Sequence, residues 1–565
     1  MAIIGIDLGT TNSLVAYFKE DHPIIIPNIY GESLTPSVVS VSEDGEVYVG
    51  RIAQERLISH PELTVSVFKR SMGSKKSYRL GSKTFTSEDL SALVIRKLKE
   101  DAEEFLGEEV DEAVISVPAY FNDTQRRATK TAGELAGLKT ERIVNEPTAA
   151  AVAYGLHDEH DYTKYLVFDL GGGTFDVSIL EKYNNVMEVR AVAGDNFLGG
   201  EDFTYVMMSW FIEHHNLDVE DLSYKEKSLL RKSAEDAKKA LSNSRNVTVS
   251  CTINKQNYEL LVTPDGYEKR CESLLGRLRN PIKRALSDAS IKLQDIESVL
   301  LVGGATKMPL IRTFVSKLMG RFPSVAIDPD EVVAMGTAVH SAMKRRNKAI
   351  TEIVLTDVCP YTLGTNISLR KPNGFHESGH FYPIIERNSV IPVSRSERLV
   401  TVYDNQDIIN VEILQGESRK ADDNVLLGEL NVPIPEGKAG QEAIDVRYTY
   451  DINGILEVDI TVISTGVSKT LILEKNPGIL TEEEIAEKLA ALKSLKVHPR
   501  DKDENRLLLA KAERLYEENI GEARMILSQE IVIFESLLDR QDEREIRDYA
   551  VRFSELLREI EDYME

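Results

Sequence analysis

Two aspartates each precede a short glycine-bearing turn. Asp7 follows the apolar run Ile3–Ile6 and leads into Leu-Gly-Thr-Thr, and Asp169 follows the apolar run Tyr165–Phe168 and leads into Leu-Gly-Gly-Gly-Thr. An alternating apolar segment follows each turn, as in a β-hairpin. Two copies of one hairpin suggest a duplicated half-domain.

The chemistry that such turns offer is phosphate binding. Glycines have no Cβ, so a phosphate chain can approach the backbone N–H groups, and Thr10, Thr11 and Thr174 add hydroxyl donors. Two carboxylates that face one polyphosphate suit Mg²⁺, which keeps most of its waters and binds through one or two carboxylates. Either turn alone is explained by a tight hairpin, but the pair predicts a shared nucleotide site with Asp7 and Asp169 beside the metal.

Two further charged residues stand where they could act on a bound nucleotide. Thr64–Arg70 alternates like a strand and carries Lys69 near its end, where a lysine is either a solvated edge charge or a clamp on a γ-phosphate. Glu146 lies at a strand-to-helix corner before Pro147. It is either a favourable first-turn residue or the group that orients an attacking water.

Two later glycine-bearing segments are candidates for the same site. Gly194–Asp202 precedes a helix and is a second phosphate-loop candidate. Gly303–Thr306 follows the buried strand Ser298–Val302 and precedes a helix from Pro309, which is a place for a sugar or an α-phosphate. Asp328–Glu331 begins one more helix.

Helices are expected to support these groups. Ser87–Leu106 is amphipathic, with apolar residues at helical spacing, and Asn122-Asp123 begins a helix that carries Arg126. Val219–Leu241 is expected to be helical. Its last turns group four polar residues that a solvated charged face would also explain: Glu235, Lys238, Lys239 and Ser242.

Composition limits the class of protein. With 565 residues and 42% hydrophobic content, the chain can form three or four domains, and the net charge of −24 argues against partners such as nucleic acid or an anionic membrane. The three cysteines are widely spaced and match no metal pattern, so we expect buried thiols in a reducing compartment. The N-terminus lacks the pattern of a signal peptide, and no apolar run approaches the ~20 residues of a membrane span, so we expect a cytoplasmic protein.

Several catalytic classes lack their motifs. The chain has no GxxxxGK[ST] stretch and no HExxH, and no Ser-His-Asp arrangement stands out. The doubled hairpin, strand lysine, corner glutamate and later Gly-Gly turns are typical of the ATPases that share the actin, hexokinase and heat-shock-chaperone architecture.

The chain resembles the seventy-kilodalton heat-shock chaperone family of DnaK type, as a divergent, short-lidded bacterial-type member. Seven stretches carry this resemblance: GIDLGTTNS (5–13), VPAYFND (117–123), NEPTAAAVAYGL (145–156), DLGGGTFDVS (169–178), LGGEDF (198–203), LVGGATKMP (301–309) and ILQGE (413–417).

The resemblance implies a fold and a domain order. It implies an α/β actin-like ATPase domain, duplicated and ribonuclease-H-like, over residues 1–349, followed by an interdomain linker over 350–358. A β-sandwich substrate-binding domain over 359–478 and an α-helical lid over 479–565 complete the chain. The linker is more polar than usual at Thr356 and could equally be a first β-strand. The lid begins at a capping-box-like Thr481–Glu484, breaks near Pro499, and is short for the family, so we expect it to hold peptide less tightly.

The resemblance also implies residue roles. Asp7 and Asp169 would hold Mg²⁺ through water, with K⁺ ions flanking the phosphates. Hydrolysis would use Lys69, Glu146, Thr174 and Asp176, and Pro118 and Arg126 would relay the nucleotide state to the peptide-binding half. ATP or ADP would bind to Gly9, Thr10, Thr11, Asn12, Gly171, Gly172, Gly173, Gly199, Gly200, Glu201, Glu235, Lys238, Lys239, Ser242, Gly303, Gly304, Ala305, Lys307 and Asp330.

Two departures concern the adenine site. The family usually sandwiches adenine between two arginines, and Lys239 and Lys307 stand at those positions. Because lysine cannot stack a planar charge on the base, we expect weaker nucleotide binding and faster spontaneous exchange. The segment Asn243–Thr263 is also brief. We therefore expect this chain to lack the loop that many bacterial members offer to an exchange factor, which puts a dedicated exchange factor in doubt.

The second half would bind an extended apolar peptide. The implied cleft residues are Leu363, Thr365, Ile367, Ser368, Leu399, Val402, Gln406, Ile409 and Val411. Ser368 and Val402 would form an arch over the peptide, and the polar Thr365 and Ser368 suggest a narrower or shifted substrate preference. The long segment Leu369–Phe381 contains His376 and His380. It is interpreted either as a metal site formed by these histidines or as a plain surface loop.

The resulting prediction is an ATP-driven chaperone. ATP would open the cleft for unfolded or client polypeptides, hydrolysis would close it, and a J-domain co-chaperone would accelerate hydrolysis; we expect a monomer that serves the stress response. Two alternatives remain at this point: an actin-fold small-molecule kinase, and a specialised regulator that binds one folded client.

Overall fold

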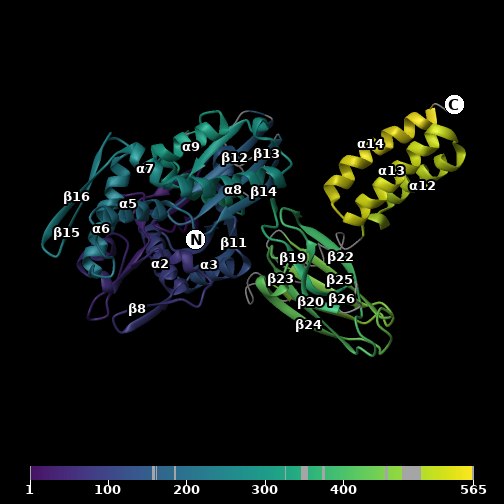
Figure 1. Ribbon diagram of the computed structural model, residues 1–565, viewed down its shortest axis with the longest axis horizontal. Helices are drawn as coiled ribbons and strands as arrows, with labels where there is room; N and C mark the ends of the chain where they lie inside the picture. Colours follow the sequence, from purple (N-terminus) through teal and green to yellow (C-terminus); the bar gives the residue numbers. More distant parts are fainter. Residues whose placement is uncertain are drawn as a thin grey trace. The chain divides into compact units, whose positions relative to one another are not determined.

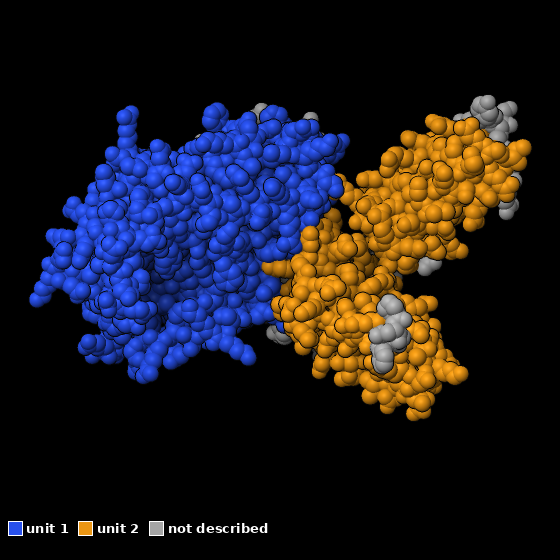
Figure 2. Space-filling model, viewed as in Figure 1, with its two compact units in different colours: residues 1–360 blue, residues 361–565 orange. Residues whose placement is uncertain are grey.

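The computed structural model describes residues 2–155, 160, 162–183, 186–324, 326–344, 354–371, 376–451, 456–473 and 498–562. The chain forms two compact units, residues 1–360 and residues 361–565, which are coloured separately in Figure 2. The domain limits predicted from the sequence remain predictions. The predicted lid start at Thr481–Glu484 and the first residues of the predicted linker, 350–353, lie outside the described residues.

The first unit contains two large sheets of similar topology (Figure 1). The first sheet has the order β11-β10-β1-β2-β3, with bounds β1 Ala2–Asp7, β2 Asn12–Lys19, β3 His22–Ile26, β10 Val110–Val117 and β11 Lys139–Asn145. The second has the order β17-β12-β13-β14-β18, with bounds β12 Tyr162–Leu170, β13 Phe175–Tyr183, β14 Val186–Asp195, β17 Ser298–Val302 and β18 Val354–Val358. In each, three strands form an antiparallel meander and a parallel strand pairs with the first of them.

Helices cover these sheets, and the smaller strands form one three-stranded sheet and two hairpins, apart from β4, which pairs with β2. The helices are α1 Arg51–Ser59, α2 Ser87–Leu106, α3 Asp123–Leu135, α4 Glu146–Gly155, α5 Gly200–His214, α6 Tyr224–Ala240, α7 Pro264–Arg270, α8 Glu272–Asp288, α9 Pro309–Met319 and α10 Val332–Lys344. The 3-10 turns are η1 Pro61–Leu63, η2 Phe68–Ser71, η3 Leu293–Asp295 and η4 Gly304–Lys307. The smaller strands are β4 Thr35–Pro36, β5 Val38–Val41, β6 Val47–Val49, β7 Thr64–Ser66, β8 Ser77–Leu80, β9 Lys83–Thr86, β15 Val247–Ile253 and β16 Gln256–Val262.

Each large sheet has its own hydrophobic core. Ile4 and Ile6 of β1 pack with Val94 and Leu98 of α2, and all four side chains are buried. The second core joins β12 and β13 to the helices that follow them, for example through Phe168. The two halves therefore fold around separate cores, and the predicted nucleotide groups belong to both.

Two local expectations are wrong. Thr64–Arg70 is not one strand, because β7 ends at Ser66 and Val67 has φ +61°, which turns the chain into η2. Lys69 therefore lies on a 3-10 turn. The helix expected over Val219–Leu241 begins only at Tyr224, where Ser223 caps it by accepting a hydrogen bond from the Glu226 N–H.

The second unit contains two four-stranded sheets and a helical bundle. One sheet has the order β20-β19-β23-β24, with bounds β19 Leu363–Arg370, β20 His376–Ile385, β23 Ile408–Gln415 and β24 Val425–Pro433. The other has the order β22-β25-β26-β27, with bounds β22 Val393–Val400, β25 Ala443–Tyr450, β26 Leu456–Val462 and β27 Ser468–Leu473. Further short elements of this unit are β21 Val390–Ile391 and the turns η5 Ala421–Asp423 and η7 Pro499–Asp501.

The bundle consists of α12 Asp503–Glu518, α13 Gly521–Arg540 and α14 Glu543–Asp562. Its core includes Leu515, Leu527, Phe534, Phe553 and Leu557, which recur at helical spacing on the three helices. The helical periodicity predicted after Pro499 is thus confirmed. Within the described parts of the chain, the structure holds no helix that is both long enough and apolar enough to span a membrane.

Candidate functional site

The two glycine-bearing turns lie against each other. A Cβ on Gly172 would come within 2.5 Å of the Thr11 side chain, and one on Gly173 would come within 2.6 Å of the Thr10 side chain. Only glycine at positions 172 and 173 leaves room for this approach, so the second turn needs its glycines where the threonines of the first turn meet it. The turns face one another from the two sheets, as a shared phosphate site requires.

Four carboxylates and a lysine gather beside these turns. Lys69 Nζ lies 2.8 Å from Glu146 Oε1, and both side chains are buried. Asp169 and Asp176 are 5% and 1% exposed, and each has one carboxylate oxygen, Oδ2, without a hydrogen-bond partner among the described residues. Asp7 completes the group and accepts a hydrogen bond from Ser116 Oγ at 2.9 Å.

This crowding changes how the aspartates ionise. Burial, followed by repulsion from Glu146, raises the pKa of Asp7 to about 7 and that of Asp176 to about 7. Burial and repulsion from Glu146 also raise the pKa of Asp169 well above its usual range. The site holds excess negative charge that a bound cation would neutralise.

The residues present fit Mg²⁺. The unpartnered buried oxygens of Asp169 and Asp176 are hard ligands of the kind that Mg²⁺ prefers. Among the described residues, no three histidine, cysteine, aspartate or glutamate side chains are placed to ligate one ion together. The fit is therefore to an ion held by one or two carboxylates, with water and phosphate supplying the other ligands.

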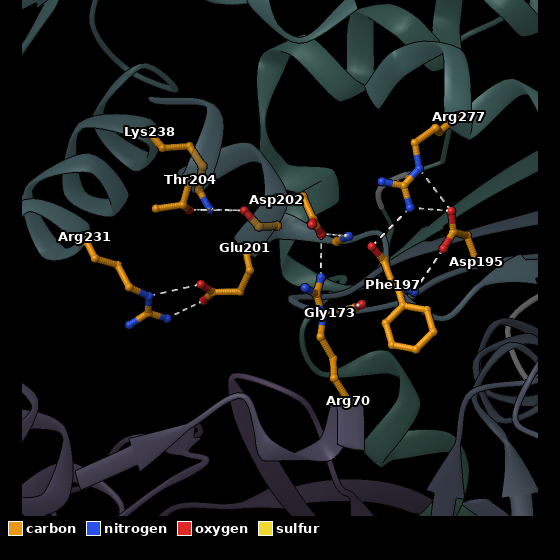
Figure 3. Close-up of polar contacts among 12 residues, drawn as sticks. Arg70, Gly173, Asp195, Phe197, Glu201, Asp202, Thr204, Arg231, Lys238 and Arg277 are labelled. Carbon is orange, nitrogen blue, oxygen red and sulfur yellow. Dashed lines mark hydrogen bonds and ion pairs between the residues drawn. The ribbon is translucent and has the colours of Figure 1, made fainter. Parts of the chain in front are cut away.

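The N-terminus of α5 is attached to the second turn (Figure 3). The Gly200 and Glu201 N–H groups donate to the Gly171 and Gly172 carbonyls, each at 2.9 Å. Lys238 of α6 donates to the Gly200 carbonyl at 2.9 Å, and Arg231 of α6 forms a bidentate pair with Glu201 at 3.1 and 2.6 Å. The structure thus brings α5 and α6 together behind the predicted phosphate loop.

The remaining predicted nucleotide residues lie around this group. Gly304 would clash with Asp330 Oδ1 at 2.5 Å if it carried a Cβ, and Ala305 Cβ lies 3.3 Å from the position that a Cβ on Gly200 would take. Ser242 is exposed just beyond the end of α6. Gly9 and Asn12 belong to the first turn, where the Gly9 N–H donates to Ser13 Oγ at 3.1 Å.

Both lysines at the expected adenine positions are already paired. Lys307 Nζ lies 2.7 Å from Asp328 and 2.6 Å from Asp330. Lys239 Nζ lies 3.3 Å from Glu235, and 70% of its side chain is exposed. In this structure both ammonium groups therefore face carboxylates.

A buried hydrogen-bond chain leads from the predicted relay to β18. Arg126 donates to the Ala119 carbonyl at 2.9 Å and to Asn145 Oδ1 at 2.6 Å. Asn145 Nδ2 in turn donates to Asp357 Oδ2 at 2.7 Å, and β18 pairs in parallel with β14. Pro118 is buried beside this chain, and its carbonyl accepts the Phe121 N–H. The described part of the predicted linker, residues 354–358, is therefore a β-strand that pairs with β14.

In the second unit, the predicted cleft residues lie on three strands and one loop. Thr365 and Ile413 are paired neighbours on β19 and β23, so Leu363, Thr365 and Ile367 share a face with alternate residues of β23. Ile409 and Val411 lie on β23, Leu399 lies on β22, and Ser368 lies at a bulge in β19.

Gln406 shapes the loop after β22. It accepts the Val402 N–H at 2.9 Å and donates to the Ile408 carbonyl at 3.0 Å, which folds 401–407 on itself. His376 and His380 belong to β20 rather than to a surface loop, and the rings of His376 and Tyr403 lie 5.9 Å apart. No metal cluster including these histidines is found among the described residues.

Comparison with known proteins decides the family. A family model described as "Hsp70 protein" matches residues 3–562. The chain is 40% identical over 497 residues to "Chaperone protein DnaK" of Thermosipho melanesiensis, which covers 86% of this chain and 82% of that protein. It is 40% identical over 499 residues to the protein of the same name from Thermotoga neapolitana, again over 86% and 82%. The chain belongs to the Hsp70 family.

As a member of the Hsp70 family, the protein is an ATP-dependent molecular chaperone and an ATPase. The family uses ATP and ADP with Mg²⁺, which agrees with the donor set described above. Neither the actin-fold kinase nor the specialised regulator is favoured by these comparisons.

Two residues that contact the predicted site were not predicted from the sequence. Arg70, next to Lys69, contacts Gly173 and Asp202. The Tyr120 N–H donates to Asp176 Oδ1 at 3.2 Å, and the Tyr120 carbonyl accepts from Asn196 at 2.9 Å. Tyr120 lies within the stretch VPAYFND, but the contacts of neither residue follow from a local pattern, because their partners lie far away in the chain.

Proposed function

We propose that ATP binds between the two sheets of the first unit and that its hydrolysis controls peptide capture by the second unit. Asp7 and Asp169 hold Mg²⁺ through water, K⁺ ions flank the phosphates, Lys69 contacts the γ-phosphate, and Glu146 and Asp176 position the attacking water. Bound Mg²⁺ supplies charge neutralisation on the phosphates. The buried Lys69–Glu146 pair among three further carboxylates carries this proposal.

The finer architecture belongs to the same proposal. Residues 1–349 form a duplicated actin-like ATPase domain, 350–358 a linker, 359–478 a β-sandwich that binds extended apolar segments of client proteins, and 479–565 a helical lid. The similar topology of the two large sheets and the two four-stranded sheets of the second unit support it. The docked β18 strand is one state of the linker, which leaves the sheet in the other state.

The proposed partners follow from the family and from the positions where this chain departs from the family's sequence pattern. A J-domain protein stimulates hydrolysis, the chaperone acts as a cytoplasmic monomer in the stress response, and nucleotide exchange does not depend on a dedicated factor. The hairpin β15–β16 supports the last point, because two residues, Asn254 and Lys255, join its strands.

The carboxylate cluster predicts how pH acts on the nucleotide-free protein. Because the pKa of Asp176 is raised from 3.8 to about 7, the folded state binds a proton that the unfolded state has lost, and stability falls as pH rises through 7. We expect the EDTA-treated protein to have a lower melting temperature at pH 8 than at pH 6. Between these pH values the free energy of unfolding should fall by on the order of 1–4 kcal/mol.

Mg²⁺ with ADP should remove most of this difference, because the cation takes over the role of the proton. Asp176→Asn should raise the melting temperature of the nucleotide-free protein at pH 8 and flatten its pH dependence. A melting temperature that is the same at both pH values, or that Mg²⁺–ADP shifts equally at both, would argue against the proposed metal site.

The adenine site gives a second prediction. A double variant with arginine at both Lys239 and Lys307 should release ADP several-fold more slowly, because a guanidinium can stack on the base. This corresponds to about 1 kcal/mol in the activation free energy of release. Stopped-flow release of a fluorescent ADP analogue measures this rate. Lys232→Arg, at an exposed position two turns before Lys239 on α6, is the matched control. An unchanged release rate in the double variant would show that the two lysines do not set exchange.

A further inference from the structure

Arg70 and Lys69 leave the same 3-10 turn in different directions. Lys69 pairs with Glu146 at the carboxylate cluster, whereas Arg70 extends to the second glycine turn and the start of α5 (Figure 3). Arg70 Nε donates to the Gly173 carbonyl at 2.9 Å, and Nη2 donates to Asp202 Oδ2 at 2.5 Å. The Arg70 and Asp202 side chains are only 17% and 21% exposed.

Both acceptors belong to one small rigid group. Asp202 Oδ2 also accepts the Gly199 N–H at 2.8 Å, which caps α5. The next two N–H groups of α5 donate to Gly171 and Gly172, in the same turn as Gly173. A displacement of Asp202 or Gly173 therefore also moves the rest of the phosphate turn and the first turn of α5.

This contact crosses between the two halves of the first unit. The η2 turn is part of the first half, where Phe68 packs into the first core, and Gly173 and Asp202 adjoin the core of the second half. A guanidinium suits such a bridge, because its fixed fork can donate to a carbonyl and a carboxylate at once. The bridge lies next to the residues proposed to bind the phosphates.

We propose that Arg70 is a positioning residue that holds the two halves together beside the phosphates and so slows nucleotide release. It acts through Gly173 and Asp202, not through the adenine site. Losing the bridge lets the second turn move away from Lys69, which also slows hydrolysis. This inference rests on the proposed nucleotide site.

The test measures release of a fluorescent ADP analogue and single-turnover hydrolysis of ATP in the full chain. Arg70→Met should speed release about tenfold, as expected for losing charge-assisted hydrogen bonds, and should slow the single turnover. Arg70→Lys keeps the charge but not the fork, so its release rate should lie between those of the wild type and Arg70→Met. Asp202→Asn should speed release, and the double variant should be no faster than Arg70→Met alone.

A matched pair lies elsewhere in the second half. Arg270 forms an ion pair with Glu213 at 2.6 Å, far along the chain from the glycine turns, and Arg270→Met should leave both rates unchanged. Wild-type release in Arg70→Met, or additive effects of Arg70→Met and Asp202→Asn, would overturn the inference while leaving the nucleotide site intact. If the wild type itself fails to bind the ADP analogue, the proposed site and this inference fall together.

Discussion

Replacing Lys69 with alanine is expected to abolish ATP hydrolysis, with a loss of at least ~100-fold in single-turnover rate. The Lys69 side chain is 4% exposed and ion-pairs with Glu146 at 2.8 Å, beside the phosphate turns. Without its ammonium group, nothing at that position offsets the negative charge of the γ-phosphate. The variant should also lose ~3–5 kcal/mol of stability without nucleotide, because it leaves the buried Glu146 carboxylate unpaired.

A second ion pair, with a buried carboxylate, separates these two effects. Lys97 lies 2.9 Å from Asp101, whose side chain is 1% exposed, on α2 and away from the glycine turns. Lys97→Ala should lower the melting temperature in the same way but leave hydrolysis near the wild-type rate. The proposed role of Lys69 would be wrong if Lys69→Ala hydrolysed ATP within tenfold of the wild type, or if Lys97→Ala lost hydrolysis to the same extent.

Replacing Arg126 with alanine is expected to uncouple the two units. Arg126 is 6% exposed and connects the Ala119 carbonyl to Asn145, which in turn donates to Asp357 of β18. Without this buried chain of hydrogen bonds, β18 should no longer respond to whether ATP or ADP is bound. ATP should then fail to accelerate peptide release, while hydrolysis stays within a few-fold of the wild type.

Arg127 provides the matched control for this experiment. It follows Arg126 on α3, pairs with Asp123 one turn earlier, and is more exposed. Arg127→Ala should keep normal ATP-stimulated release, and Arg126→Lys should restore part of the coupling because it retains one donor. ATP-stimulated release at the wild-type rate in Arg126→Ala would rule out the relay.

The nucleotide groups could be predicted because their signals are local. Asp7 and Asp169 each sit within a short motif of strand, glycine and threonine residues, and the structure brings the two motifs into contact. The strand Ser298–Val302 and the helix Ser87–Leu106 were predicted with their observed bounds. An apolar run that ends at a Gly-Gly turn defines the strand, and apolar residues at helical spacing define the helix.

The remaining features depend on contacts across the chain. The wrong strand around Lys69 follows from the positive φ of Val67, a conformation that β-branched residues rarely adopt and that a local pattern cannot show. Arg70 is 103 residues from Gly173 and 132 from Asp202. No role was predicted for Arg70, and only the folded chain shows what it bridges.

The release rate of a fluorescent extended apolar peptide from the full chain, with and without ATP, tests the central claim most directly. We expect ATP to accelerate release in the wild type, and also in Lys69→Ala, where binding continues without hydrolysis. A peptide that binds but leaves at one rate with or without ATP, while the protein still hydrolyses ATP, would contradict coupling between the nucleotide site and the peptide-binding unit.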